Sequence, residues 1–250
     1  AISLSKHYDK RFCKIAKSIQ LHTDIRLSCH SYSNQKRYMR DILNNKIDLA
    51  YVSPFLAYNL MQRNPNLRSL VTVKEVDIIT GTDSPYYGGV IIVRKNSPFH
   101  NLMQLKNIKF GFSFHGSTSG YILPTLLFSK QLKNQNDQLL SFSQNLQQAK
   151  ALMSGKVSAI AIWSGMLKKK ILKDKVRILG SYQGVPNHQI LINTKLFSQK
   201  EQEKLLSEFI SMKDHVTHYA GFTPSSSSIS QAGRDIFKNY CHMNPKECRL

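Results

Sequence analysis

Short apolar runs alternate with segments of helical spacing along most of the chain. Runs of strand length occupy residues 1–5, 24–31, 47–52, 67–76, 89–94, 108–113, 157–163, 176–179 and 189–193. Apolar positions recur with the period of a helix over residues 8–20, 34–45, 55–62, 120–132, 144–153, 200–213 and 231–240. Strands that alternate with helices in this way are typical of layered α/β folds, so the pattern predicts an α/β protein with parallel strands.

Two segments predict that the chain passes between two lobes. Residues 87–93 form a long apolar strand that enters a new α/β block, and residues 181–193 lead back to helices that need another core. We expect one lobe of residues 1–94 and 183–250, which holds both chain ends, and an inserted lobe of residues 95–182. Ligands of open α/β folds bind beyond the carboxyl ends of the strands, so we expect a ligand cleft between the lobes.

The charge of the chain departs from the globular average. The 250 residues include 35 Lys and Arg against 15 Asp and Glu, a formal charge of +20. Such a field attracts nucleic acid, acidic membrane surfaces or small anions. No nucleic-acid-binding motif accompanies the charge, so nucleic acid is not expected as a partner. The densest run, Lys168-Lys169-Lys170 with Lys173 and Lys175, is typical of a solvated helix end.

The four cysteines, Cys13, Cys29, Cys241 and Cys248, permit three disulfide pairings, and the sequence does not choose among them. An even number fits an oxidising compartment, and four buried thiols fit the count almost as well. Their spacing does not match a zinc site. We therefore expect neither a metal nor a cofactor.

The sharpest local signal is the segment 110–121, in which a strand ends, a small polar loop follows and a helix begins. Ser117, Thr118 and Ser119 supply hydroxyls where the first helical amides have no intrahelical acceptor. Together they form either an anion-binding helix start or an ordinary capped helix. No phosphate-loop lysine, nucleophile elbow or zinc-protease motif is present. We therefore expect no catalytic residues and no enzyme.

The motif Gly116-Ser-Thr-Ser-Gly-Tyr-Ile-Leu-Pro124 resembles the Ser-Thr-Ser-Gly motif of the periplasmic phosphate-, phosphite- and phosphonate-binding proteins of ABC importers. Segments 46–54, 87–98, 101–106 and 148–159 resemble further family segments in the same order. The resemblance implies the two-lobed type II periplasmic-binding-protein fold, a periplasmic or extracytoplasmic location, a small anionic ligand and an ABC transporter permease as partner.

The resemblance also implies ligand-binding positions. The residues that bind the phosphonate oxygens in this family fall on Ser117, Thr118 and Ser119. The aromatic residues of its pocket fall on Tyr87 and Tyr51, and a family histidine falls on Asn145. Two acidic positions that hold the amino group of aminophosphonates fall on Gly165 and His188. His188 instead adds a hydrogen-bond donor, cationic if its pKa is raised. The expected ligand is therefore phosphate, phosphite, an amine-free phosphonate or another compact anion.

An alternative function uses the same fold as the ligand-sensing ectodomain of a membrane receptor such as a histidine kinase. Its partner would then be a signalling kinase and not a permease. In either case, membrane association would come only through the partner or through flanking segments. A free secreted or lipoprotein precursor would favour transport, and flanking membrane spans would favour sensing.

Overall fold

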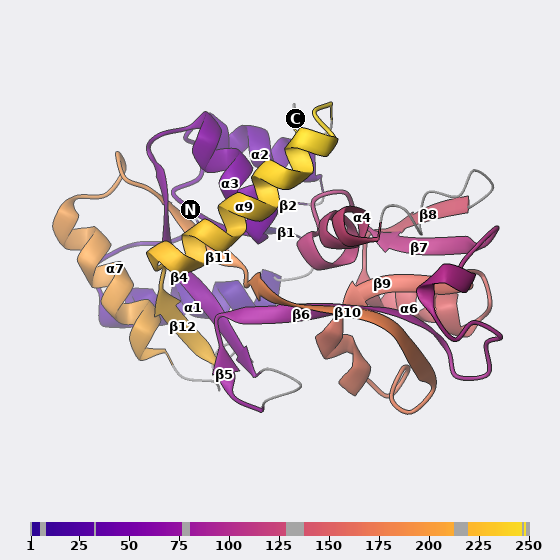
Figure 1. The fold of residues 1–250 in the computed structure, drawn as a ribbon. Helices are drawn as coiled ribbons and strands as arrows, with labels where there is room; N and C mark the ends of the chain where they lie inside the picture. The colour runs from indigo at the N-terminus through magenta and orange to yellow at the C-terminus, as the bar shows by residue number, and fades with distance from the viewer. Residues whose placement is uncertain are drawn as a thin grey trace. The chain divides into compact units, whose positions relative to one another are not determined.

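The computed structural model describes residues 2–5, 9–32, 34–76, 81–128, 138–212, 220–246 and 248. The chain divides into two compact units (Figure 1), unit 1 with residues 1–86 and 186–250 and unit 2 with residues 87–185. The sequence placed these borders at residues 94 and 183. The border before unit 2 is corrected because strand β6 (Tyr86–Arg94) pairs with strand β9 (Ala159–Trp163), so nearly all of β6 belongs to unit 2.

Unit 1 contains a mixed sheet in the order β12-β4-β11-β3-β1-β2, with β5 paired to β4. Its strands are β1 (Ile2–Ser5), β2 (Cys29–Tyr32), β3 (Leu49–Val52), β4 (Leu67–Val76), β5 (Asp83–Ser84), β11 (Gln189–Asn193) and β12 (Gly221–Pro224). β1 is parallel to β2 and β3, whereas β11 runs antiparallel to both β3 and β4. The expected parallel strands are therefore present as β1, β2 and β3, and β11 and β12 add antiparallel pairs to the sheet.

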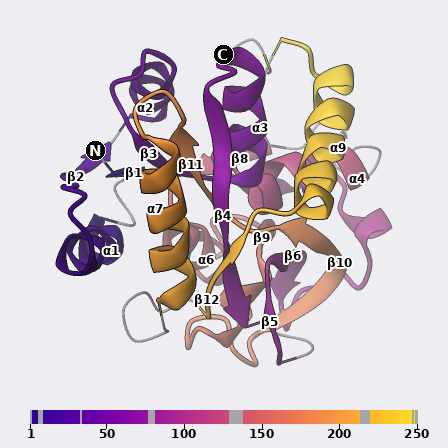
Figure 2. The same ribbon diagram turned by 90° about the vertical axis from the view of Figure 1, so that its left-hand side faces the viewer.

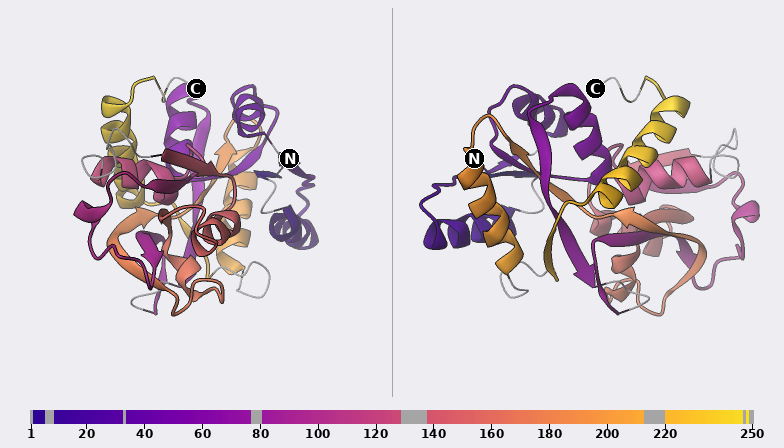
Figure 3. Two further views of the ribbon diagram at one scale, coloured as in Figure 1. Left: turned by 90° about the vertical axis from the view of Figure 1, so that its right-hand side faces the viewer. Right: turned by 60° about the vertical axis from the view of Figure 1, so that its left-hand side comes forward.

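Helices cover the sheet of unit 1. They are α1 (Asp9–His22), α2 (Gln35–Leu43), α3 (Pro54–Arg63), α7 (Gln199–Ser211) and α9 (Ser227–Met243). α3 lies beside α9 and α1 beside α7 (Figures 2 and 3). Ile19 of α1 and Phe209 of α7 are fully buried in one core with the sheet residues Val71 and Ile192. This burial of apolar helix faces is the main contribution to the stability of the unit.

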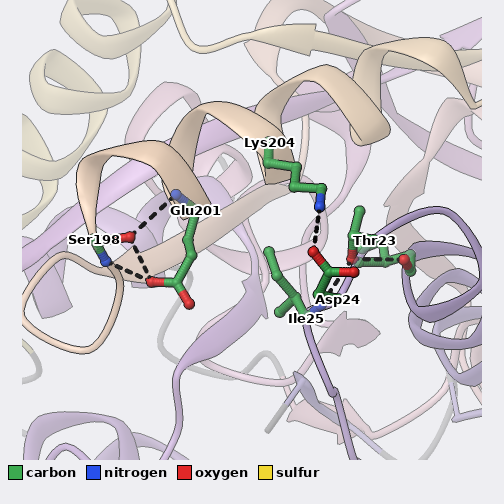
Figure 4. A network of polar contacts seen from close by, with 7 residues as sticks. Thr23, Asp24, Ile25, Ser198, Glu201 and Lys204 are labelled. Atoms are coloured by element: carbon green, nitrogen blue, oxygen red, sulfur yellow. Dashed lines mark hydrogen bonds and ion pairs between the residues drawn. The ribbon is translucent and has the colours of Figure 1, made fainter.

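Polar contacts fix the ends of α1 and α7 (Figure 4). Ser198 and Glu201 form a capping box at the start of α7. The Thr23 hydroxyl donates to the carbonyl of Ile19 at 2.7 Å and accepts from the amide of Ile25 at 3.1 Å. Lys204 contacts Asp24 at 3.0 Å and, by hydrogen bond and charge, lowers the pKa of that carboxyl group. The contacts of Ser198, Glu201 and Thr23 satisfy backbone groups at or beside the helix ends.

Two disulfides connect elements of unit 1. Cys13 of α1 is bonded to Cys29 of β2, and Cys241 of α9 is bonded to Cys248. The structure thus selects one of the three pairings that the sequence allowed, and no cysteine is a free thiol.

Unit 2 contains a sheet in the order β10-β6-β9-β7-β8. Besides β6 and β9, its strands are β7 (Lys109–Ser113), β8 (Gln138–Phe142) and β10 (Val176–Pro186). The helical segments are η1 (Leu102–Gln104), η2 (Thr118–Ile122), α4 (Leu123–Leu127), α6 (Asn145–Met153) and η3 (Ser164–Lys168). β7 is parallel to β8 and β9, and β6 is antiparallel to β9.

The central strands of unit 2 are buried on both faces. On β6, Val90 and Ile92 pack into one core with α6, while Ile91 and Val93 pack into a second core on the opposite face. Successive strand residues point to opposite faces, so a continuous apolar run is required here. This explains why the sequence signal for β6 and β9 was strong.

Several elements differ from the sequence expectations. Strands β8 and β12 were not predicted, and β10 extends to Pro186, well beyond residue 179. β8 is an edge strand in which every residue is exposed or half-buried, so its sequence lacks a continuous apolar run. α9 starts at Ser227 because the Ser226 side chain accepts from the amide of Ile229. The expected residues 1, 8, 129–132 and 213 lie outside the described part of the chain.

None of the described helices has the length and apolar character that a bilayer crossing needs. Over the same residues, no three His, Cys, Asp or Glu side chains are grouped so that they could hold a metal ion.

Candidate functional site

One edge of the unit 2 sheet gathers the predicted site residues of that unit. Ser113 at the end of β7 pairs with Phe142 at the end of β8, so the segments that follow both strands start at the same edge. Trp163 at the end of β9 pairs with Gly89 near the start of the antiparallel β6. The edge therefore carries the sequence-predicted residues Ser117, Thr118, Ser119, Asn145 and Tyr87. Open α/β sheets bind ligands beyond the carboxyl ends of their strands, which is this edge, and we call it the ligand edge.

Ser117 starts the helix that follows β7. Its side chain accepts a hydrogen bond from the amide of Gly120 at 3.2 Å, and its carbonyl accepts from Tyr121 at 3.1 Å and Ile122 at 3.0 Å. The bond from Ile122 spans five residues and makes a π-helical turn, η2. Ser117 is therefore an N-cap, one of the two roles that the sequence allowed. Thr118 and Ser119 occupy the first helical turn, where backbone amides have no acceptor within the helix and carry the positive end of its dipole.

A buried glutamine fixes the strand that precedes this loop. Gln148 of α6 is fully buried, and its amide donates to the carbonyls of Gly111 at 2.9 Å and Ala161 at 2.7 Å. Its oxygen accepts from the Ser113 hydroxyl at 3.1 Å. A Cβ atom on Gly120 would lie 2.1 Å from that hydroxyl, so only glycine fits there. The helix start is thus held tightly against the end of β7.

Tyr182 of β10 was missed by the sequence reasoning. Its hydroxyl donates to the carbonyl of Ser119, and the side chain is buried. Burial, and then the nearby Tyr87, raise the pKa of the Tyr182 phenol well above its usual value, so it stays a donor. A Cβ atom on Gly89 would lie 2.2 Å from the Tyr182 hydroxyl. The sequence signal for this contact is the glycine pair Gly88-Gly89 at the start of an apolar strand, because glycines leave room for a large side chain such as Tyr182.

Two further positions lie at the same edge. Asn145 is the first residue of α6 and is partly buried. Gly165, which the resemblance places at an acidic position of the family, lies two residues after Trp163. A Cβ atom there would lie 2.2 Å from the indole ring. Space that a carboxylate would need is therefore occupied by Trp163.

Tyr51 and His188 belong to unit 1 and lie together. Tyr51 of β3 is buried, and its ring stacks on the His188 imidazole with centroids 4.8 Å apart and planes 5° apart. The pairing of Ile190 with Tyr51 explains this, because it places the segment before β11 beside the end of β3. The structure brings these two predicted residues together in unit 1.

The hydrogen bonds of His188 define its tautomer. The side-chain oxygen of Asn187 accepts the His188 amide at 2.8 Å, which fixes it as the acceptor, and it lies 3.3 Å from Nδ1 of the ring. Nδ1 must therefore carry the hydrogen, and Nε2 of the neutral ring is an acceptor. Burial lowers the pKa of His188 to about 4. The condition for a cationic His188, a raised pKa, is therefore not met: at neutral pH the ring is uncharged, and it donates through Nδ1.

Asn187 is a second residue that the sequence reasoning missed. It is 1% exposed, and its side-chain nitrogen has no hydrogen-bond partner among the described residues. A buried donor without a partner costs free energy unless water or a ligand satisfies it. Its only signal in the sequence was its place beside His188.

The family model that matches the chain is the periplasmic substrate-binding protein of phosphonate ABC transporters, over residues 3–240. This family consists of transport proteins and not enzymes. It implies a small-molecule ligand, a permease partner and a periplasmic setting. No curated protein matches the sequence. The matched family lends no support to the receptor-ectodomain alternative.

Solved structures show the same fold at low sequence identity. PhnD1 from Prochlorococcus marinus (MIT 9301), in complex with methylphosphonate, is 17% identical with a TM-score of 0.79, over 97% of each chain. XAC2383 from Xanthomonas citri, bound to chloride ion, is 14% identical with a TM-score of 0.78, over 98% of each chain. A binding protein component of an ABC phosphonate transporter from Pseudomonas aeruginosa is 15% identical with a TM-score of 0.76, over 98% of this chain and 88% of its own.

These structures share the two-lobed α/β fold of periplasmic binding proteins. With the family match over nearly the whole sequence, the chain belongs to the periplasmic phosphonate-binding proteins of ABC transporters.

Proposed function

We propose that this protein binds a small phosphorus oxyanion without an amino group, namely phosphate, phosphite or a simple alkylphosphonate, and delivers it to an ABC importer. The supporting observation is the helix start at Ser117–Ser119, held by Gln148 and Tyr182 at the ligand edge of unit 2. Hydroxyls and first-turn amides there suit an oxyanion. Methylphosphonate, bound by the Prochlorococcus protein, is the first ligand to test.

Residues of unit 1 are part of the same proposal. Asn187 offers a buried side-chain N–H donor, and Tyr51 with His188 offers a flat, uncharged surface. We propose all three as ligand-binding residues, together with Tyr87 and Asn145 of unit 2. The absence of a carboxylate from this set suits a fully ionised anion, because a carboxylate would repel it.

A thermal-shift screen tests the proposal. Phosphate, phosphite, methylphosphonate, 2-aminoethylphosphonate and sulfate are each added to the purified protein. A ligand that binds only the folded state raises the melting temperature by mass action. We expect stabilisation by at least one of the first three anions. A flat response to all three would reject the proposed ligand class.

Replacing Thr118 should weaken binding without unfolding the protein. Thr118→Ala removes a hydroxyl at the helix start, where a charged acceptor would be left short of a donor. We expect the dissociation constant for the best oxyanion to rise by about 5- to 150-fold, which corresponds to about 1–3 kcal/mol, in calorimetric titration. Thr125→Ala in α4, further along the same helical segment, is the matched control and should bind as the wild type does. Equal affinity of Thr118→Ala and wild type would remove Thr118 from the site.

Amine-bearing phosphonates should bind weakly. The two family positions that hold acids in aminophosphonate binders carry Gly165 and the neutral His188, and an ammonium group needs a carboxylate or several acceptors when buried. One neutral acceptor at His188 does not replace two charges. We expect 2-aminoethylphosphonate to bind about 30-fold more weakly than methylphosphonate, which is about 2 kcal/mol. Titration of both ligands decides this, and equal or tighter binding of the aminophosphonate would refute the prediction.

A further inference from the structure

Exposed lysines gather at the end of unit 2 opposite to the ligand edge. Strand β6 starts at the ligand edge and ends at Arg94, and a strand of nine residues spans roughly 25 Å. The turns at this far end carry six exposed lysines, which we call the basic end: Lys95, Lys106, Lys109, Lys156, Lys173 and Lys175. Among the described residues of unit 2, Asp174 is the only acidic one.

Backbone contacts hold these turns together. The amide of Lys95 donates to the carbonyl of Lys175 at 2.8 Å, and the amide of Ser158 donates to the carbonyl of Lys109 at 2.8 Å. The turns after β6, before β7, before β9 and before β10 therefore meet at one end of the sheet (Figure 1). A groove of about 600 Å³ opens there, lined by Arg94, Lys95, Asn96, Met153, Asp174 and Lys175.

The side chains of the two arginines in this region, Arg94 and Arg177, donate hydrogen bonds to backbone carbonyls of unit 2. Arg94 donates to the carbonyls of Leu152 at 2.6 Å and Val157 at 3.2 Å. Arg177 donates to the carbonyls of Ser97, Phe99 and Lys95 at 2.9–3.0 Å. The cations presented to solvent are therefore lysines, which are compact point charges without a fixed recognition geometry.

We propose that the basic end itself binds to an anionic membrane surface, in place of the expectation that membrane association comes only through a partner or flanking segments. Lysine charges suit a diffuse layer of lipid headgroups, where each lysine adds to a field effect and needs no defined partner. A protein partner would need an apolar interface centre. Ile108 and Val157 in these turns are buried, and the groove is lined by a single, half-buried apolar residue, Met153. Single-stranded nucleic acid would need aromatic side chains for stacking, and residues 94–97, 106–109, 156–158 and 173–175 include none.

A charge-matched pair of variants tests the proposal by vesicle flotation. The first variant carries Lys95→Gln, Lys109→Gln, Lys156→Gln and Lys175→Gln. The control carries Lys17→Gln, Lys36→Gln, Lys200→Gln and Lys238→Gln, four exposed lysines of unit 1, and has the same net charge. We expect wild type to bind vesicles that contain phosphatidylglycerol, to release them at high salt and not to bind pure phosphatidylcholine. The first variant should bind about tenfold or more weakly than the control.

Other outcomes would overturn the proposal. Equal losses of vesicle binding in both variants would mean that the net charge acts without a defined surface. If the wild type did not bind anionic vesicles but bound a DNA duplex, the partner would be nucleic acid and not a membrane. Hydrogen exchange of the wild type with anionic vesicles gives a check that needs no variant: protection should rise at residues 94–97 and 106–109, and protection elsewhere alone would contradict it. Methylphosphonate binding by the first variant is measured separately, so failure of one proposal is distinguishable from failure of the other.

Discussion

Replacing Gln148 with leucine should lower the free energy of unfolding by about 3–5 kcal/mol. Leucine is similar in size but leaves the Ser113 hydroxyl and the carbonyls of Gly111 and Ala161 without their side-chain partner. Each buried polar group left without a partner costs about 1–3 kcal/mol. Urea denaturation followed by circular dichroism measures the change. Because Ser113 ends the strand that leads to Ser117, the variant should also lose affinity for the oxyanion.

The neighbouring residue supplies the control for this experiment. Gln147 is exposed on the same helix, and its replacement by leucine should change the free energy of unfolding by only about 0.5 kcal/mol. If Gln148→Leu were as stable as Gln147→Leu, the buried hydrogen bonds would not determine the position of the loop, and that part of our account would be wrong.

Acid should destabilise the protein through His188. Burial lowers the pKa of this residue from 6.5 to about 4 in the folded chain. Between these values the unfolded chain binds a proton that the folded chain does not, so the free energy of unfolding falls as the pH drops from about 6.5 to 4. The full difference is roughly 3 kcal/mol. Urea denaturation at a series of pH values measures it.

His188→Gln isolates this contribution, because the carboxyl groups that also titrate in acid are the same in both proteins. The variant should lose less stability than wild type on acidification, by up to that amount. His100→Gln, at an exposed position, should keep the pH dependence of the wild type. Identical pH dependence of His188→Gln and wild type would show that His188 is not held in its neutral form by burial.

The sequence predicted the parts of this protein that local pattern determines. Both faces of β6 and β9 are buried, so consecutive residues of these strands must be apolar, and such a run is visible in the sequence. The loop at Ser117 was predictable for a similar reason. Small hydroxyl residues between an apolar strand and a helical pattern are typical of a capped helix start.

The parts that depend on distant residues were not predictable. Tyr182 reaches the carbonyl of Ser119 from a strand whose position depends on pairing with β6, and nothing near either residue indicates the contact. The charge of His188 depends on burial, so its residue type alone did not determine it: the sequence allowed a cationic donor if the pKa were raised, and burial lowers the pKa. The pairing of Cys13 with Cys29 likewise depends on the packing of α1 against β2.

The central claim is that a phosphorus oxyanion binds at the helix start that Ser117 caps. Amide NMR shifts recorded while methylphosphonate, and then phosphate and phosphite, are titrated into the protein test it most directly. Our account predicts saturable shifts, with at least one of these anions, that are largest at the amides of residues 117–121. Shifts absent for all three anions, or confined to residues far from this helix start, would contradict it.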